Sequence, residues 1–509
     1  MTPNKPRQAG QNRKLRKIRS APVRIAGAAL IFVATGMLVS AIVGFIDGGG
    51  DGGALLWSAA ITAATGSLFV LGSTGQGRAD PAISFAAVAW SWVAASIAGA
   101  VPFLLTGAVS WRDADNALFE SVSGFTCTGS TILPDIDSLP HGLLFFRQMT
   151  QWFGGMGLIV LAVAVLPALK VGGLELIDKE APGPSTDRLT PRIRETAARL
   201  WQLYFGVTVA VTGALMLAGL SLYDAVGHAF ATVATGGFST RGSSAGAFDS
   251  VAVELVLIVG MIFCGASFTM HWQASRRGLS AYRVSEFSWY LSILGGGFAL
   301  VVWLNVGELT MLNNLRESAF NVVTIVTSTG FGTSDFTGWS VAVQMVFLMM
   351  MIVGGMTGST TGGIKVLRLQ VVWRYAFREI IRSRHPRAVL PMRLGSTIVP
   401  EQIAARAVGF VLVYLGLIVV GGVVVTALGT DPVTAFSGAI SAIGNDGPAL
   451  GNAGPHSTFL AYPRPARPVL MGLMLAGRLE IFPTLLMFAA SARYLGRSRL
   501  GVRSSPDPF

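Results

Sequence analysis

Four short polar stretches, each containing glycine, carry the residue types of this chain that are best suited to chemistry. They read FTCTGST, TVATGGFST, TSTGFGTSD and IGNDGPALG, and we align them on Gly129, Gly236, Gly330 and Gly447, which are 107, 94 and 117 residues apart. A dehydrated alkali cation needs several close, neutral oxygen ligands, and main-chain carbonyls on an extended segment provide them in layers. Glycine permits the backbone angles that aim successive carbonyls inward. The four stretches therefore predict a cation site built from main-chain oxygens.

Three consecutive residues of each stretch are the predicted cation ligands. They are Cys127, Thr128 and Gly129, then Ala234, Thr235 and Gly236, then Ser328, Thr329 and Gly330, and finally Asn445, Asp446 and Gly447. Each of the first three triplets resembles part of the TVGYG filter of potassium channels, in which four loops are used. The fourth triplet keeps only the glycine. Asp446 either faces the cation path or points away and pairs, and the cost of a charge at membrane depth favours the second.

A short apolar run precedes each polar stretch and must position it. These runs cover 117–127, 225–234, 318–327 and 433–443. A membrane-spanning helix takes about 20 residues, so each run is only half long enough. Irregular backbone inside a membrane must be buried in protein or line a water-filled path. Four ordinary outer loops would not repeat this pattern four times, so we expect four re-entrant half-helices around one shared path.

The remainder of the chain contains apolar runs that are long enough to span a membrane. Of the 509 residues 52% are hydrophobic and 13% are charged, and the mean hydropathy is +0.59. Ten runs have the required length: 22–46, 54–72, 82–107, 143–169, 200–220, 250–271, 284–305, 339–364, 403–428 and 469–490. They predict an all-α polytopic membrane protein, with no strand-type alternation that would suggest a β-barrel. No cleavable signal is expected, because no small-residue cleavage site follows the first run.

The basic residues of the chain are clustered in a way that indicates membrane topology. The net charge of +12 comes largely from residues 1–24, 276–283, 365–393 and the tail after the last apolar run, while acids gather in the alternate loops. Such a bias marks cytoplasmic loops, which places both termini in the cytoplasm and argues against a nucleic-acid partner. Arg464 and Arg467 break the pattern, because they should lie outside.

Nothing in the sequence suggests an enzyme or a bound cofactor. Cys127 and Cys264 lie in apolar surroundings, and they form neither a metal-binding pattern nor a disulfide framework. The five histidines are scattered, without an HExxH motif, and no nucleophile–base set is recognisable. A membrane enzyme is therefore a remote alternative to a transport protein.

The run GGMTGSTTGGIK, at 354–365, interrupts the predicted span 339–364. It is close to a phosphate-binding loop, but Lys365 comes one place late and no apolar strand precedes it. Small residues also serve as a packing face between helices. The density of glycine with serine and threonine instead favours a broken helix with a polar loop.

Arg478 stands about halfway along the last apolar run. An arginine at membrane depth is a functional candidate by default, and its structural alternative is a buried pair with Glu480 or with a loop carbonyl. Glu120, in the first half-helix, either bonds the backbone behind the polar turn or adds negative potential near the mouth of the cation path, and we favour the structural role.

Taken together, these motifs resemble the Trk/Ktr/HKT superfamily of potassium transporters, most closely its bacterial TrkH-type branch. The resemblance covers nearly the whole chain and rests on stretches in family order: FESVSGFTCTGSTIL, QWFGGMGLIVLAVAVLP, LTPRIRETAARLWQLYFG, VATGGFSTR, GGMTGSTTGGIKVLR, GPALGNAGP and LAGRLEIFP. Asp446, where an uncharged residue is usual, and GPALG in place of GPGLG depart from the family pattern. In the plant branch, serine at the place of Gly129 is associated with sodium selectivity, so the glycine favours potassium.

The resemblance implies four pseudo-repeats around one pore, preceded by two extra helices. It implies the boundaries 1–75 for the basic N-terminus and extra helices, and 76–195, 196–280, 281–398 and 399–509 for the repeats. An intramembrane gating loop is expected at Thr357, Gly358, Ser359, Thr360, Thr361, Gly362 and Gly363, with Arg478 beside it below the filter.

The expected function is potassium uptake across the bacterial inner membrane, with the potassium ion as substrate and no cofactor of its own. The resemblance further implies a homodimer in membrane lipid and a cytosolic regulatory partner of the TrkA type, through which a nucleotide would act. A symporter that couples potassium to protons or sodium is the alternative.

Overall fold

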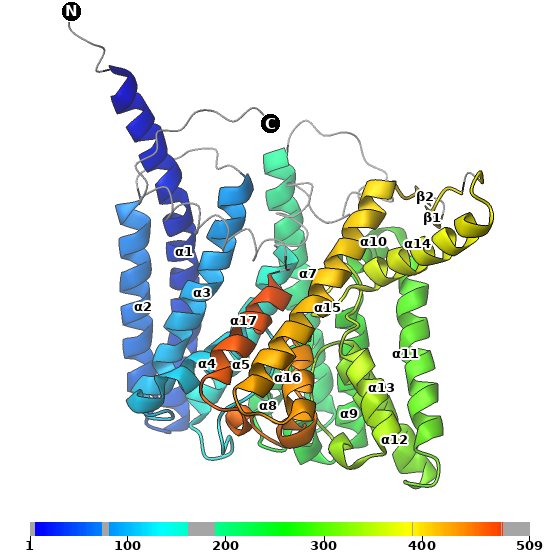
Figure 1. Ribbon diagram of the computed structural model, residues 1–509. Helices are drawn as coiled ribbons and strands as arrows, with labels where there is room; N and C mark the ends of the chain where they lie inside the picture. Colours follow the sequence, from blue (N-terminus) through cyan, green and yellow to red (C-terminus); the bar gives the residue numbers. More distant parts are fainter. Residues whose placement is uncertain are drawn as a thin grey trace, which may run out of the picture.

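The computed structural model describes residues 6–73, 81–160, 189–388, 390–395, 397–479 and 481, and these are predominantly helical (Figure 1). Six described helices contain segments long and apolar enough to cross a membrane. They are α1 (Pro6–Asp47), α2 (Gly52–Gly72), α3 (Pro81–Leu105), α7 (Leu189–Leu217), α11 (Ser285–Leu304) and α15 (Glu401–Ala427). They correspond to predicted spans, although α1 begins well before the apolar run at 22–46. The prediction of a mostly helical protein with several membrane-spanning helices is confirmed.

Two predicted spans are described only in part. The span 143–169 begins with α5 (His141–Val160), and the span 469–490 begins with α17 (Ala466–Arg478). Their later portions, together with Glu480 and the arginines of the tail, lie outside the described residues.

The predicted span 250–271 is not one straight helix, because the chain bends by 93° inside it. The two pieces are α9 (Val251–Gly265) and α10 (Phe268–Arg277). At the break, the carbonyl of Gly265 accepts a hydrogen bond from Met356 N at 2.9 Å, and Phe268 N donates to Gly358 O at 3.1 Å. Main-chain groups that a continuous helix would pair internally are therefore satisfied by the segment 351–365.

The predicted span 339–364 is also broken, as its glycine-rich run suggested. Helix α13 covers Val341–Met350, and the chain is then non-helical until α14 begins (Val366–Arg384). Val353 and Ile364 form an isolated bridge, so 351–365 is a hairpin-like loop. After α14, which lies almost across the other helices in Figure 1, β1 (Arg393–Leu394) pairs antiparallel with β2 (Thr397–Ile398).

Four short helices occupy the places of the predicted half-helices. They are α4 (Ala114–Phe125), α8 (Leu222–Ala234), α12 (Met311–Val326) and α16 (Pro432–Gly444). The C-terminal half of each is buried, and each is followed by one of the four polar stretches. Short 3₁₀ helices lie in the connections: η1 (Trp111–Asp113), η4 (Ser244–Phe248), η5 (Leu279–Tyr282), η6 (Phe336–Gly338), η7 (Gly451–Ala453) and η8 (Phe459–Ala461).

The two ends of the helix array differ in charge. Helix α14 and the basic connection after α10 lie at the same end as the start of α1, whereas the α1–α2 connection, with Asp47 and Asp51, lies at the other (Figure 1). The exceptional Arg464 and Arg467 have a structural explanation. Arg464 forms an ion pair with Asp113, and Arg467 Nη1 lies 3.2 Å from Asp115 Oδ2. They hold the start of α17 against η1 and α4.

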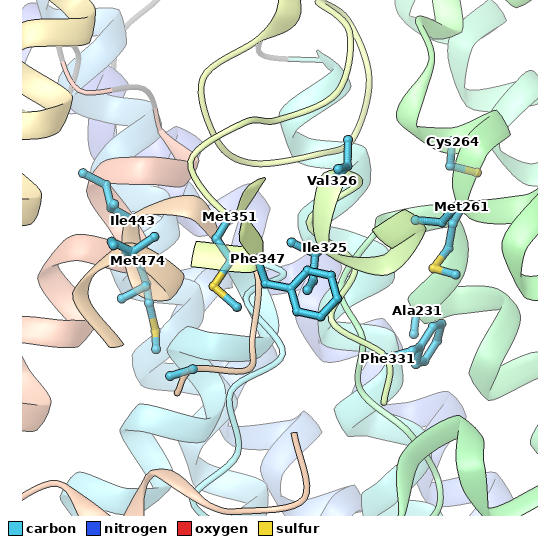
Figure 2. Close-up of a cluster of buried hydrophobic side chains, with 14 of the residues drawn as sticks. Ala231, Met261, Cys264, Ile325, Val326, Phe331, Phe347, Met351, Ile443 and Met474 are labelled. Atoms are coloured by element: carbon cyan, nitrogen blue, oxygen red, sulfur yellow. The ribbon is translucent and has the colours of Figure 1, made fainter. Parts of the chain in front are cut away.

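A buried apolar cluster joins the short helices to their neighbours (Figure 2). Its labelled members come from α8, α9, α12, α13, α16, α17 and the connections after α12 and α13: Ala231, Met261, Cys264, Ile325, Val326, Phe331, Phe347, Met351, Ile443 and Met474. Because apolar side chains from distant parts of the chain interdigitate here, the C-terminal ends of the short helices are fixed relative to one another.

Candidate functional site

The four polar turns that end the short helices share an unusual backbone conformation. Their first residues have left-handed φ angles between 46° and 56°: Cys127, Thr235, Ser328 and Asn445. Two residues later, φ lies between 76° and 97° at glycines: Gly129, Gly237, Gly330 and Gly447. Left-handed backbone is uncommon for residues other than glycine and is found where surrounding structure enforces it.

This conformation corrects the predicted alignment of the second turn. Its equivalent residues are Thr235, Gly236 and Gly237, whereas the sequence alignment chose the triplet that begins at Ala234. The hydrogen bonds agree, because the middle residue of every turn donates its N–H to the carbonyl five residues earlier: Thr128 to Ser123, Gly236 to Ala231, Thr329 to Thr324 and Asp446 to Ser441. Two consecutive glycines made the sequence ambiguous, and the backbone angle and the hydrogen-bond pattern together distinguish them.

The glycines of the four turns lie directly against the backbone of the next turn. A Cβ atom on Gly129, Gly237 or Gly330 would lie less than 3.0 Å from the carbonyl oxygen of the middle residue of the following turn, and one on Gly447 would meet Thr128 in the same way. The contacts run from the first turn to the second, third and fourth and back to the first. The turns therefore form a closed ring in chain order, and no side chain fits at its four glycines.

Side chains reinforce the contact between the first and fourth turns. Ser130 Oγ donates to Gly447 O at 2.9 Å, and Asn445 Nδ2 donates to Thr128 Oγ1 at 3.0 Å. These bonds join residues more than 300 positions apart in the chain, so they close the ring between the first and the last of the four turns.

A buried ion pair, which sequence reasoning only half predicted, supports the first two turns. Arg147 Nε lies 2.6 Å from Glu120 Oε1, and both side chains are almost inaccessible to solvent. Glu120 also accepts from Ile132 N at 2.9 Å, and Arg147 Nη1 donates to Ser239 O at 3.0 Å. The structural role favoured for Glu120 is confirmed. Arg147 was missed, although a lone arginine inside the apolar run 143–169 was an available signal.

Gln151 on α5 was also missed, and it holds the second turn. Its Nε2 donates to Gly236 O at 2.5 Å, and its Oε1 accepts from Phe238 N at 3.0 Å. The side-chain amide thus satisfies two main-chain groups of an irregular segment, which a buried turn requires.

In the first, third and fourth turns, the side chain of the middle residue points back toward the short helix of its own turn. Thr128 Oγ1 is 2.7 Å from Thr126 Oγ1, and Thr329 is paired with Thr327 in the same way at 2.8 Å. In the fourth turn Asp446 takes the place of this threonine. Its Oδ2 lies so close to Gly444 that a Cβ there would clash with it. The carboxylate therefore points away from the other turns, and it has no hydrogen-bond partner among the described residues.

The non-helical loop 351–365 packs against this ring on the side that faces α14. Gly362 N donates to Ser328 Oγ of the third turn at 2.6 Å. A Cβ on Gly362 would lie less than 3.0 Å from Gly444 O, at the end of α16. Thr360 and Thr361 are fully buried. The loop is therefore packed against the third turn and against the end of α16, where the fourth turn begins.

Arg478 connects the loop to the first turn. Its Nη1 donates to Thr360 O at 2.7 Å, and its Nη2 donates to Cys127 Sγ at 2.9 Å. The loop carbonyl, one of the two expected partners, is thus confirmed. The other, Glu480, lies outside the described residues. Arg478 is 1% exposed, so a fixed positive charge is buried just below the ring.

Two further side chains fix the end of the loop next to α14: Lys365, its last residue, and Glu286, in the first turn of α11. Lys365 Nζ donates to the carbonyl of Thr361 and, at 2.9 Å, to its hydroxyl. Glu286 Oε1 accepts from Thr357 N at 2.6 Å and from Leu367 N at 3.2 Å, so one carboxylate bridges the loop and the first turn of α14.

Within the described part of the chain, no group of three or more His, Cys, Asp or Glu residues is placed to hold a metal ion. The chemistry of the ring is instead that of neutral main-chain oxygens and threonine hydroxyls. That its residues bind a cation remains a prediction at this point.

Comparison with known proteins gives the family. The family model for TrkH, described as a cation transport protein, matches residues 58–295 and 297–496. The chain belongs to the TrkH family. All four turns, the loop and Arg478 lie within the matched residues.

Individual TrkH relatives agree over almost the whole chain. The Trk system potassium uptake protein TrkH of Halomonas elongata is 39% identical over 475 residues, covering 92% of this chain and 97% of that protein. The TrkH of Escherichia coli (strain K12) is 37% identical over 475 residues, with 92% and 98% covered. The crystal structure of the potassium transporter TrkH from Vibrio parahaemolyticus matches with a TM-score of 0.85 and 33% identity, covering 93% of this chain and 98% of that one.

The buried pair of Glu120 and Arg147 generates a stability prediction. Arg147→Met should destabilise the protein by about 3–5 kcal/mol, because it leaves an unpaired carboxylate in the interior. The measurement is the apparent melting temperature in detergent, followed by size-exclusion chromatography.

The matched control is Arg199→Met, which removes an exposed ion pair with Glu195 at 3.6 Å and should cost no more than about 1 kcal/mol. The double variant Glu120→Gln with Arg147→Met should melt above the single Arg147 variant. Equal melting of Arg147→Met and wild type would show that the pair does not support the turns.

Proposed function

We propose that this protein takes up potassium across the bacterial inner membrane through a selectivity filter formed by the four turns. The observation that carries this proposal is the closed ring in which each glycine lies against a carbonyl of the next turn. The TrkH relatives support the choice of ion, because they are potassium uptake proteins by name. The likeness of the four turns supports four pseudo-repeats around one pore, divided at the boundaries expected from the sequence.

The ring has the chemistry that a potassium filter requires. Carbonyl oxygens are neutral and numerous, so they replace the hydration shell of a monovalent cation without holding it too tightly to leave. The turns are also held from behind by Gln151 and by the pair of Arg147 with Glu120. Such support keeps the oxygens at fixed positions, which is what discrimination between cations of different size needs.

The loop 351–365 and Arg478 are the proposed gate. In this conformation Gly362 and Thr360 are bonded to the third turn and to Arg478, so the loop lies across the exit from the ring. A unit charge of the same sign at about 4 Å raises the energy of a cation by about 4 kcal/mol in an effective dielectric of about 20. The loop would thus block the path by its volume and Arg478 by its charge.

The cytoplasmic side would carry the regulation. We propose that both termini, α14 and the basic connection after α10 lie on the cytoplasmic side, because basic residues concentrate on that side of membrane proteins. The Trk system named in the relatives supports a cytosolic TrkA-type partner, and with it regulation by a nucleotide that the partner binds. A homodimer in the lipid bilayer is proposed on the family resemblance.

Electrical recording on the reconstituted protein tests the function. In a potassium gradient, the current through a channel reverses at the potassium equilibrium potential. In a symporter, the reversal potential shifts when the proton or sodium gradient is changed. No potassium current or flux in either condition would refute the proposal.

Gly237→Ala tests the corrected filter. The residue has a φ of +76°, and a Cβ there would lie less than 3.0 Å from Thr329 O, so the substitution should distort two turns at once. Gly129→Ser should act in the same way. Both variants should lower the potassium-over-sodium permeability ratio several-fold in bi-ionic reversal measurements.

Gly332→Ala is the control, because a Cβ at Gly332 would make only ordinary contacts of 3.5 Å or more. A wild-type reversal potential for Gly237→Ala would mean that the second turn is not in the assigned register.

Loss of the loop and loss of Arg478 should each open the proposed gate. Deletion of residues 358–362 removes the obstruction, and Arg478→Ala removes both the charge and the bond to Thr360. Each single variant should raise potassium flux into liposomes without the partner. The double variant should gain less than the two single gains combined, because both act on one barrier. Wild-type flux in both single variants, with protein that is still folded, would exclude these features as the barrier.

The exposed basic end of α14 is the proposed docking surface for the partner. Arg378 is unsuitable for a test, because it lies 2.7 Å from Glu401 and supports the local structure. Replacing Arg382, Arg384 and Arg387 with glutamine should instead weaken binding of the TrkA-type protein several-fold, since each exposed pair contributes up to about 1 kcal/mol.

The control replaces three basic residues on the same side: Arg276, Arg277 and Arg283. Equal affinity of the two triple variants for the partner, measured in detergent at one salt concentration, would place docking elsewhere.

A further inference from the structure

An apolar cavity of about 290 Å³ lies between α1, α3, α5 and α7, and the proposed function makes no use of it. Helix α1 lines the cavity with Ile25, Ala29 and Phe32, whose spacing places them on one face of the helix. The lining also contains small residues from three helices, and these leave the space open: Ala29, Ser91, Ala95, Gly154 and Gly157.

The packing around the cavity is tight, so the cavity is not a sign of a loose interior. A Cβ on Gly157 would lie 2.5 Å from the ring of Trp92, and one on Gly36 would lie 2.5 Å from the ring of Phe153. The ring centroids of Phe32 and Phe153 are 4.5 Å apart. Protein interiors contain few voids larger than a water molecule, and an empty apolar void is destabilising. A space of this size between closely packed helices is therefore suited to an occupant.

The chemistry of the lining fits a hydrocarbon and not water or an ion. The two polar side chains that α3 contributes are satisfied within the protein: Ser91 Oγ donates to Ala87 O at 2.8 Å, and Trp92 Nε1 donates to Phe125 O at 3.3 Å. A buried water needs two or more polar partners, whereas an apolar cavity stays dry and takes up apolar molecules.

The cavity opens on a surface that faces lipid when the protein is in a membrane. Ile25 is 43% exposed and Phe32 is 40% exposed. Both belong to the segment Val23–Asp47, which is long and apolar enough to cross a membrane. The molecules present at this surface are lipids, and an acyl chain can enter the cavity sideways from the bilayer.

A basic residue lies at the end of the cavity that is nearer the start of α1. Ile25, Val88 and Trp201 all stand near the first residue of their spans, and Arg24 directly precedes Ile25. Arg24 is exposed and forms no ion pair within the described part of the chain. Basic residues beside the cytoplasmic leaflet attract anionic lipid head groups.

We propose that an anionic phospholipid of the cytoplasmic leaflet inserts one acyl chain into this cavity, with its phosphate near Arg24. The chain would contact Phe125, the last residue of α4, and Gly154, at which a Cβ would lie 3.0 Å from Cys127 Sγ. The lipid therefore fills the space behind the first turn and supports the end of its short helix. The site does not depend on potassium transport, and only the choice of leaflet rests on the orientation given under the proposed function.

Photolabelling of the purified full-length protein tests the site. The probe is phosphatidylglycerol with a diazirine in one acyl chain, added to delipidated protein in detergent, and peptide mass spectrometry locates the adducts. Adducts should form at Phe32, Trp92 and Trp201, which line the cavity. Ala29→Trp, which fills the cavity from α1, should lower this labelling at least several-fold.

The matched control is Ala28→Trp, at the neighbouring exposed position outside the lining, and it should leave the labelling unchanged. Adducts on the outer faces of the helices alone, or equal labelling of the two variants, would overturn the proposal, because lipid would then only surround the protein. If Ala29→Trp does not fold, Ala95→Leu fills the cavity from α3 and should lower the labelling in the same way, and unchanged labelling of that variant would refute the site.

The head group is tested with phosphatidylcholine that carries the same diazirine chain. The wild type should be labelled several-fold less by this lipid than by phosphatidylglycerol, and Arg24→Gln should remove the difference. Equal labelling of the wild type by the two lipids would refute the contact with Arg24.

Support of α4 by the lipid is tested by thermal unfolding. Because a ligand that binds only the folded protein stabilises it, added phosphatidylglycerol should raise the apparent melting temperature of the wild type and of Ala28→Trp by several degrees more than that of Ala29→Trp. An equal rise in all three proteins would refute the support. These measurements need no ion flux, so they succeed or fail independently of the proposed potassium uptake.

Discussion

Contact between a glycine and a carbonyl oxygen, repeated between each pair of neighbouring turns, is the constraint on which the rest of this structure depends. The four turns approach so closely that no side chain fits at Gly129, Gly237, Gly330 or Gly447. Because irregular backbone at membrane depth must be satisfied by protein, every other feature near the ring serves the turns. The short helices position the turns, and buried polar side chains form hydrogen bonds with the main chain of the turns. The apolar cluster of Figure 2 fixes the helix ends.

The same constraint explains how the ring communicates with the rest of the molecule. Packed turns cannot shift independently, so a side chain that contacts one turn acts on all four. Arg478 contacts the first turn and Thr360 of the loop, and Gly362 of the loop contacts the third turn. Glu286 continues this chain of contacts from the loop to α14. These hydrogen bonds connect α14 through the loop to the ring, and they are the path by which the proposed partner would act on the proposed filter.

Much of this arrangement could be predicted from the sequence, because it depends on local patterns of residue types. Apolar length marked the spans, half-length runs marked the short helices, and glycine with threonine marked the turns and the loop. What escaped prediction depends on tertiary contacts. The register of the second turn depends on the backbone angle of Gly237. The bend after Gly265 depends on hydrogen bonds from a loop some 90 residues later in the chain. The turns are also supported by Arg147 and Gln151, which are side chains of a separate helix. For Asp446 the sequence favoured a side chain that points away from the cation path and pairs; the structure shows the predicted direction, but no hydrogen-bond partner among the described residues.

Anomalous scattering from crystals grown with rubidium in place of potassium is the most direct test of the central claim that the four turns form one cation site. Rubidium is a close chemical substitute for potassium, and its anomalous signal identifies it without reference to the protein model. We predict rubidium peaks inside the ring bounded by Thr128, Gly236, Thr329 and Asp446, separated by the loop and Arg478 from the side of α14. Rubidium bound elsewhere in the protein, with no peak inside the ring, would contradict it.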